Sequence, residues 1–161
     1  MSKKITLDKL DYQILNEMIA DSQISYADLG KKLSVSAGTI HVRIKKLQEI
    51  GIITGARMTV DIKELGYDVI AFVGFYLQKS SMYESVAKEL KKIPQIVRLN
   101  YTTGTYSMFA ELVCKDIHQL KQVLHEQLQY IKGIERTETL ISLEESFSRS
   151  IFVQNEDGIQ E

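Results

Sequence analysis

Positively charged side chains gather in one short stretch of the sequence, residues 34–57, SVSAGTIHVRIKKLQEIGIITGAR. Four cations stand there against the single acid Glu49: Arg43, Lys45, Lys46 and Arg57. Lys and Arg side chains bind phosphate groups, and the Ser, Thr and His side chains among them can hydrogen-bond phosphates or the edges of bases. The chemistry that these residue types could carry is therefore the binding of a polyanion.

The charge of the whole chain does not indicate a nucleic-acid partner, because its formal net charge is −1. Residues 1–61 hold nine Lys/Arg and seven Asp/Glu, a net charge of +2, whereas residues 62–161 hold eleven and fourteen, a net charge of −3. The excess of cations is confined to the N-terminal part, which is the pattern of a local electrostatic footprint.

Three short helices are predicted to position these cations within residues 1–60. Asp8, Ser25 and Ser36 are good N-caps for the three helices, and apolar residues recur at helical spacing after each of them. Residues 34–35 form a tight turn between the second and third helices, and Gly51 follows the third helix where a C-terminal glycine belongs. This pattern is typical of a helix-turn-helix DNA-binding domain.

The outer side of the third helix carries the candidate DNA contacts. Ile40, Ile44 and Leu47 face inward, and the small residues at its start suit a major groove about 12 Å wide. The predicted DNA-binding residues are Ser36, Gly38, Thr39, His41, Arg43, Lys45 and Lys46. We expect His41 and Thr39 to reach base edges, and Ser36 and the three cations to contact the phosphate backbone. The alternatives are a solvated charged helix face and, for His41, a surface histidine with no role.

The second half of the chain predicts an α+β domain. A β-rich run at 52–62 (IITGARMTVDI) is expected first, and the connection between the domains at 61–68. The order strand-helix-strand-strand-helix-strand then follows, over residues 69–77, 81–93, 96–102, 108–114, 116–131 and 134–143. This βαββαβ order is the ferredoxin-like arrangement. We therefore expect a ferredoxin-like domain at 69–145 and a C-terminal extension at 146–161, in which 148–154 could add a short edge strand.

The first strand of this domain, VIAFVGFYL, is apolar on both of its sides. Two helices cover only one face of a four-stranded sheet, so the other face needs a second cover. A symmetric pair of chains is the simplest cover, and it would present two recognition helices to successive turns of DNA, about 34–36 Å apart.

Together these residues resemble a known family. The stretch 7–61 and the pieces ELGYDV, YTTGTYSMF and TETLISL resemble the Lrp/AsnC feast/famine transcription regulators, and the three pieces are most similar to the AsnC branch. The resemblance implies an amino-acid-responsive DNA-binding regulator whose ferredoxin-like domain, called RAM, senses the effector. It further implies homodimers that form through their RAM sheets and assemble further, for example into an octamer of four dimers.

The resemblance places the effector pocket near the glycine-containing turn of the RAM domain. The candidate effector-binding residues are Tyr101, Thr102, Thr103, Gly104, Tyr106 and Ser107. Gly104 can adopt a left-handed conformation, and the nearby N–H and hydroxyl groups could hold a carboxylate. Many relatives carry an acid where Ser107 stands, so asparagine is the first effector to test and glutamine the next. The alternative is a plain hairpin turn.

Other classes of function find little support in the sequence. No catalytic motif is present, so we expect no enzyme, and His118 and His125 lack the further ligands that a metal site needs. Cys114 is the only cysteine, which suits a small buried residue in a reducing cytosol. No run reaches the roughly 18 apolar residues of a membrane helix. We expect a cytoplasmic, nucleoid-associated protein without cofactors, and the alternative function is an architectural protein that wraps DNA with low sequence specificity.

Overall fold

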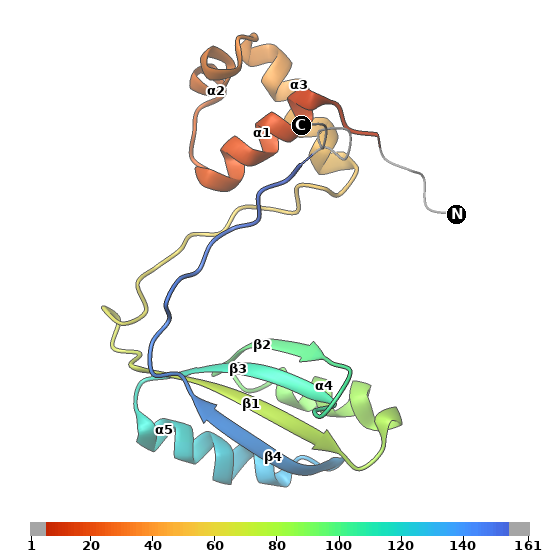
Figure 1. Cartoon of the computed structure of the whole chain (residues 1–161), viewed down its shortest axis with the longest axis vertical. Coiled ribbons are helices and arrows are strands. Elements are labelled where there is room, and N and C mark those ends of the chain that lie inside the picture. The colour runs from red at the N-terminus through yellow and green to blue at the C-terminus, as the bar shows by residue number, and fades with distance from the viewer. Residues whose placement is uncertain (1–5, 155–161) are drawn as a thin grey trace, which may run out of the picture. The chain divides into compact units, whose positions relative to one another are not determined.

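The structure is a computed structural model that describes residues 6–154, and the chain divides into two compact units (Figure 1). The first unit contains the described residues up to Met58 together with those from Phe147 onward, and the second spans Thr59–Ser146. The chain thus leaves the first unit, builds the second, and returns. The residues 61–68 that we expected as a connection group with the second unit.

Three helices form the first unit: α1 (Lys9–Ala20), α2 (Tyr26–Leu33) and α3 (Ala37–Glu49). Each begins at its predicted cap, because the side chains of Asp8, Ser25 and Ser36 accept hydrogen bonds from backbone N–H groups in the first helical turns. One apolar core holds the helices together, made of Ile14, Leu15, Leu29, Ile40, Ile44 and Leu47. Burial of this set fixes one side of α3 and leaves the other side exposed.

The turn between α2 and α3 depends on a close backbone approach. Ser34 adopts the left-handed conformation (φ 58°), and the Val35 N–H donates to the Gly30 carbonyl at 2.9 Å. A Cβ atom on Gly30 would lie 2.7 Å from the Val35 oxygen, so a larger residue at this position would push the turn open. Val35 and Ile40 both pack against the core, as a hydrophobic staple requires.

The β-rich run predicted at 52–62 is wrong, because the structure has no strand there. Ile52 and Ile53 donate their N–H groups to the Leu47 carbonyl, at 2.9 and 3.1 Å, and pack against the core of the first unit. These two residues therefore terminate α3 and extend the core of the first unit. The rest of the run has no partner strand and is not covered by other apolar residues. Met58, for example, is 83% exposed.

The second unit is a four-stranded antiparallel sheet with helices on one face (Figure 1). Its elements are β1 (Val69–Leu77), α4 (Tyr83–Leu90), β2 (Ile96–Tyr101), β3 (Met108–Cys114), α5 (Ile117–Gln122) and β4 (Ile134–Ile141). The strand order is β2-β3-β1-β4, with antiparallel pairing throughout. The ferredoxin-like α+β class predicted for this half is therefore confirmed.

The second helical segment is not one continuous helix, as the sequence suggested. After α5 the chain widens into a π-helical turn (Val123–Gln127) and tightens into a 3₁₀ turn (Leu128–Tyr130). Val123 in the widened turn is fully buried in the core, whereas Ile117 at the start of α5 is 56% exposed. The buried side of this segment therefore does not follow the spacing of one continuous α-helix.

The C-terminal extension forms no strand over 148–154. Instead, the Asn16 side chain of α1 donates to the Val153 carbonyl and accepts from the Val153 N–H, both at 2.8 Å. These two bonds occupy both backbone groups of Val153, which a strand partner would need. The remaining residues of the extension, 155–161, lie outside the described part of the chain.

Candidate functional sites: the exposed face of α3 and the Gly104 turn

The first turn of α3 combines a firm cap with an open surface. The Ser36 hydroxyl accepts from the Thr39 N–H at 3.0 Å and lies 2.9 Å from the Thr39 hydroxyl, so these two residues hold each other. A Cβ atom on Gly38 would meet only the Ser36 hydroxyl oxygen, at 3.7 Å. The fold itself does not require glycine at position 38. Glycine would be needed there if this surface must approach another molecule closely.

The next turns of α3 present the predicted contact residues to solvent. His41, Lys45 and Lys46 are all exposed, and so is their neighbour Val42, at 66%. The Lys45 ammonium lies 3.9 Å from Glu49, a long and exposed ion pair that leaves the cation available. Lys46 makes no ion pair with any residue that the structure describes.

Tyr26, at the start of α2, also belongs to this surface. Its ring lies 5.8 Å from the His41 ring at an interplanar angle of 52°. Tyr26 is also more than one-third exposed. An aromatic residue directly after the Ser25 cap, at the exposed end of a short helix, was the signal that could have identified it.

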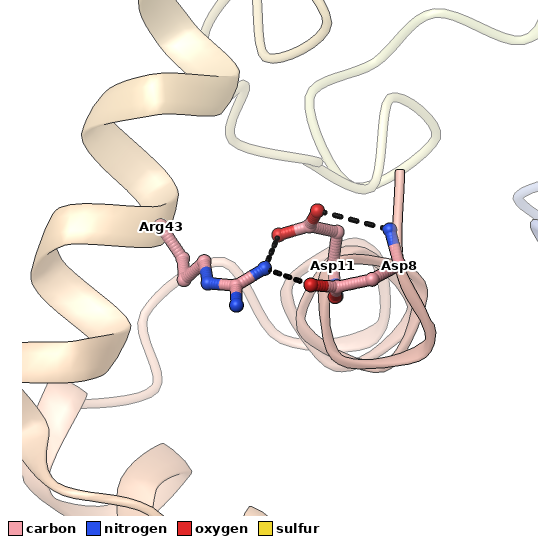
Figure 2. A network of polar contacts seen from close by, with 3 residues as sticks. All are labelled: Asp8, Asp11 and Arg43. Carbon is pink, nitrogen blue, oxygen red and sulfur yellow. Dashed lines mark hydrogen bonds and ion pairs between the residues drawn. The ribbon is translucent and has the colours of Figure 1, made fainter. Parts of the chain in front are cut away.

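Arg43 does not face outward with the other cations, although a phosphate contact was predicted for it. Its guanidinium donates to the Asp8 carboxylate and, at 3.0 Å, to the Asp11 carboxylate at the start of α1 (Figure 2). Asp11 is only 1% exposed, and it is the one charged residue among the buried residues that the structure describes. Arg43 therefore anchors α3 to α1.

The two acids in this network also cap α1 reciprocally. The Asp8 N–H donates to Asp11 at 3.2 Å, and the Asp11 N–H donates to Asp8 at 3.0 Å. The Arg43 hydrogen bond, followed by the bond from the Asp11 backbone, lowers the pKa of Asp8 below its ordinary value. One guanidinium thus neutralises part of an acidic helix start and ties it to α3 (Figure 2).

The predicted ligand turn lies between β2 and β3. Gly104 has φ 102°, in the region that glycine alone adopts without strain. The Thr102 N–H donates to the Ser107 carbonyl at 3.0 Å, and the Thr102 hydroxyl donates to the Tyr106 carbonyl at 2.7 Å. The N–H groups of residues 103–105, at the tip of the turn, have no hydrogen-bond partner among residues 6–154. These N–H groups at an exposed turn are suited to an anion.

The predicted effector residues do not all converge on this turn. The Tyr101 ring packs 4.4 Å from Tyr83 of α4, on the helix-covered side of the sheet. The Tyr106 ring lies on the open side, where it covers Gly74 of β1. Ser107 is held by β1, because its N–H donates to the Phe75 carbonyl at 2.9 Å. The sheet therefore separates the Tyr101 ring from the Tyr106 ring.

The open face of the sheet carries a polar and aromatic cluster that the sequence did not predict. Glu138 of β4 accepts from the Tyr106 hydroxyl at 2.8 Å and from the Tyr76 hydroxyl at 3.0 Å. The Arg136 guanidinium lies 3.8 Å above the Tyr76 ring and 3.6 Å from Glu138. These bonds, with that from Tyr106 the largest cause, lower the pKa of Glu138, and the same bond raises the pKa of Tyr106. Alternation in IERTETL, with charges on the side away from the helices, was the available signal.

Other kinds of site find no support in the described residues. No group of three or more His, Cys, Asp or Glu side chains within residues 6–154 could hold a metal ion. Cys114 is buried, and burial raises the pKa of its thiol. In the same part of the chain, no helix combines the length and the apolar character needed to cross a membrane.

Two family profiles match the sequence, one in each half. The profile described as Lrp/AsnC ligand binding domain matches residues 70–151, and the winged helix-turn-helix DNA-binding profile matches residues 7–54. The Regulatory protein AsnC of Escherichia coli K12 is 42% identical over 145 residues, which cover 90% of this chain and 95% of that protein. The Haemophilus influenzae AsnC is 41% identical over the same length, covering 90% and 97%. The solved structure of E. coli AsnC matches with a TM-score of 0.87 and 40% identity, over 92% of this chain and all of that one.

Proposed function

The chain belongs to the Lrp/AsnC family of transcriptional regulators, and from that premise we propose that a free amino acid controls its binding to DNA. The helix-turn-helix of the first unit binds DNA, and the second unit is the ligand-binding domain. The family is not enzymatic. The proposal concerns the residues that make each contact, the identity of the ligand, and the self-assembly that links ligand binding to DNA binding.

The exposed face of α3 is proposed to enter the major groove of double-stranded DNA. His41 and Thr39 read base edges there, with the Tyr26 ring beside His41. Gly38 permits close approach, and Ser36, Lys45 and Lys46 contact the phosphate backbone. One observation carries this assignment: the buried side of α3 is fixed by the core and by Arg43, so a single exposed, cationic side remains.

The Gly104 turn is proposed to hold the carboxylate of the effector. Its support is the set of unpaired N–H groups at residues 103–105, which the left-handed Gly104 presents to solvent. Asparagine is the proposed effector, and glutamine the next to test, because Ser107 offers a neutral hydroxyl where an acid would favour a different ligand. Tyr101 is left out of the proposed site, since it lies on the other side of the sheet.

A second copy of the chain is proposed to cover the open face of the sheet. Phe72 of β1 stacks on Phe109 of β3 there at 5.9 Å, an aromatic pair left half-buried in a single chain. Dimers would then assemble further, with an octamer of four dimers as the proposed end state. A dimer would bind two half-sites about one helical turn of DNA apart.

Light scattering combined with a DNA-binding assay tests this function. The DNA is the sequence that the protein enriches from a random pool, measured against a scrambled fragment of equal length. We expect asparagine to change both the molar mass in solution and the affinity for the enriched fragment. A chain that stayed monomeric and bound neither fragment at low ionic strength would refute the proposal.

An architectural function is the second candidate, because family assemblies of this kind can wrap DNA, and the protein would then act at the nucleoid. The low net charge of the first half argues for a local regulator, since wrapping relies on many phosphate contacts. Footprinting separates the two: discrete protected half-sites favour the regulator, and extended protection with a helical period favours the wrapping protein.

A further inference from the structure

Tyr106 connects three parts of the second unit that are far apart in the sequence. Its backbone carbonyl accepts the Thr102 hydroxyl and so closes the Gly104 turn. Its ring lies over Gly74 in the middle of β1. Its hydroxyl donates to Glu138 on β4.

The seat of the Tyr106 ring depends on the absence of a side chain at position 74. A Cβ atom on Gly74 would lie 2.4 Å from Cδ1 and 2.6 Å from Cε1 of the Tyr106 ring. Gly74 does not have a positive φ, so the backbone does not require glycine there. The close approach of the Tyr106 ring is therefore the reason for glycine in the middle of a strand.

The far end of the Tyr106 side chain belongs to the open face. Glu138 holds the Tyr106 and Tyr76 hydroxyls, one on each carboxylate oxygen, and Arg136 lies against both Tyr76 and Glu138. The Tyr106 ring also lies 5.3 Å from Tyr76 and 5.8 Å from Phe109. A shift of Tyr106 would therefore change the shape and polarity of the surface that a second copy is proposed to cover.

We propose that Tyr106 is a positioning residue that transmits amino-acid binding at the Gly104 turn to the self-association surface of the sheet. This inference rests on the proposed function, which supplies the ligand and the second copy. A ligand carboxylate that takes the Thr102 hydroxyl as its donor removes that hydroxyl from the Tyr106 carbonyl. The turn and the ring then adjust together, and the hydrogen bond from the Tyr106 hydroxyl to Glu138 changes with them.

The coupling follows from linkage. If the position of Tyr106 differs between the ligand-free and ligand-bound turn, and the association surface favours one position, ligand affinity and association constant change by the same factor. Tyr76 makes an equivalent bond to the same carboxylate, but, although its ring lies 5.3 Å from the Tyr106 ring, its side chain forms no hydrogen bond with the turn in the described part of the chain. It therefore contributes to the surface without contributing to the coupling.

The pair Tyr106→Phe and Tyr76→Phe tests the proposal, because each variant removes one hydroxyl from the same carboxylate. Calorimetry with the twenty amino acids, asparagine first, measures ligand affinity, and light scattering measures the association constant with and without the ligand. For the wild type and for Y76F we expect ligand to change association by the same factor, on the order of fivefold or more. For Y106F, which keeps the backbone carbonyl that accepts the Thr102 hydroxyl, we expect that factor to fall to about one when association is measured at saturating ligand.

Gly74→Ala provides a second perturbation of the same seat without removing any polar group. It should displace the Tyr106 ring and uncouple ligand binding from association as Y106F does, while circular dichroism reports an intact fold. Equal responses of Y106F and Y76F, or an unchanged coupling factor in Y106F, would overturn the inference and leave the proposed function standing. If the wild type binds no amino acid at all, the proposed effector control fails and this inference fails with it.

Discussion

Replacement of Arg43 by alanine should destabilise the first unit without removing a phosphate contact. The substitution leaves the Asp11 carboxylate, 1% exposed, without the guanidinium that donates to it at 3.0 Å. Breaking a buried ion pair by removing one partner costs about 3–5 kcal/mol. The Arg43 side chain is 29% exposed, so water can replace part of its contact, and Asp11 keeps the Asp8 N–H at 3.2 Å. We therefore expect a loss of about 2–3 kcal/mol in the free energy of unfolding.

A loss of this size is measurable in two independent assays. For a unit of this size, it should lower the melting temperature by roughly 10–20 °C. In a double-mutant cycle, Asp11→Asn should cost much less in the R43A background than in the wild type, because its partner is already absent. Below the melting temperature, the slope of log K against log salt for DNA binding should stay at the wild-type value in R43A, whereas Lys46→Ala should reduce it by about 0.9.

The opposite pattern would refute the anchor role of Arg43. If R43A kept the wild-type melting temperature and lost about 0.9 of the salt slope, Arg43 would be a phosphate contact after all. Arg43→Lys is the matched control, because it retains the charge and cannot reproduce the guanidinium geometry. An anchor predicts that R43K loses stability too, and a simple phosphate cation predicts that it does not.

Four further outcomes follow from the same contacts. Ser36→Ala should cost about 1 kcal/mol of unfolding free energy, measured by urea denaturation, because Thr39 loses its cap. His41→Ala should change base preference in a selection from random DNA while its salt slope stays constant. The pKa of Asp8 is lowered on folding, so the stability it contributes is complete above its ordinary value of 3.8 and is lost as pH falls through the lower folded value; acid titration should show this loss in the wild type. Gly104→Ala should weaken amino-acid binding in calorimetry, since φ 102° is strained for alanine.

Local signals in the sequence predicted most of the fold. The apolar runs at Val69–Leu77 and Met108–Cys114 are bounded by polar residues, and both strands occupy those ranges. The caps at Asp8 and Ser36 were likewise recognisable, because a cap needs only the residues beside it. Such features depend on neighbours in the chain, which a single sequence displays.

The features that the sequence did not reveal depend on a distant partner. The run at 52–62 has good strand composition, but a strand needs a second strand, and none of the described residues provides one. Arg43 resembles its neighbours Lys45 and Lys46 in sequence, and only the fold brings it to Asp11, 32 positions away. Glu138 likewise acquires its role from Tyr76 and Tyr106, 62 and 32 positions away.

The ion pairs of Arg43 with α1 also change what must hold the protein on DNA. Of the four cations in residues 34–57, Arg43 is bound to two carboxylates and Lys45 lies near Glu49, so one copy of α3 offers few free charges to phosphates. Non-specific affinity rises with the number of phosphates neutralised, so a single unit of this kind should bind weakly at physiological salt. Two or more associated copies add their contacts on one DNA molecule at high effective concentration. As for other linked binding sites, this can raise affinity by about 10²–10⁴-fold. A ligand that alters self-association therefore has strong control over DNA binding even if it never touches α3, and the modest charge of α3 is what makes that control effective.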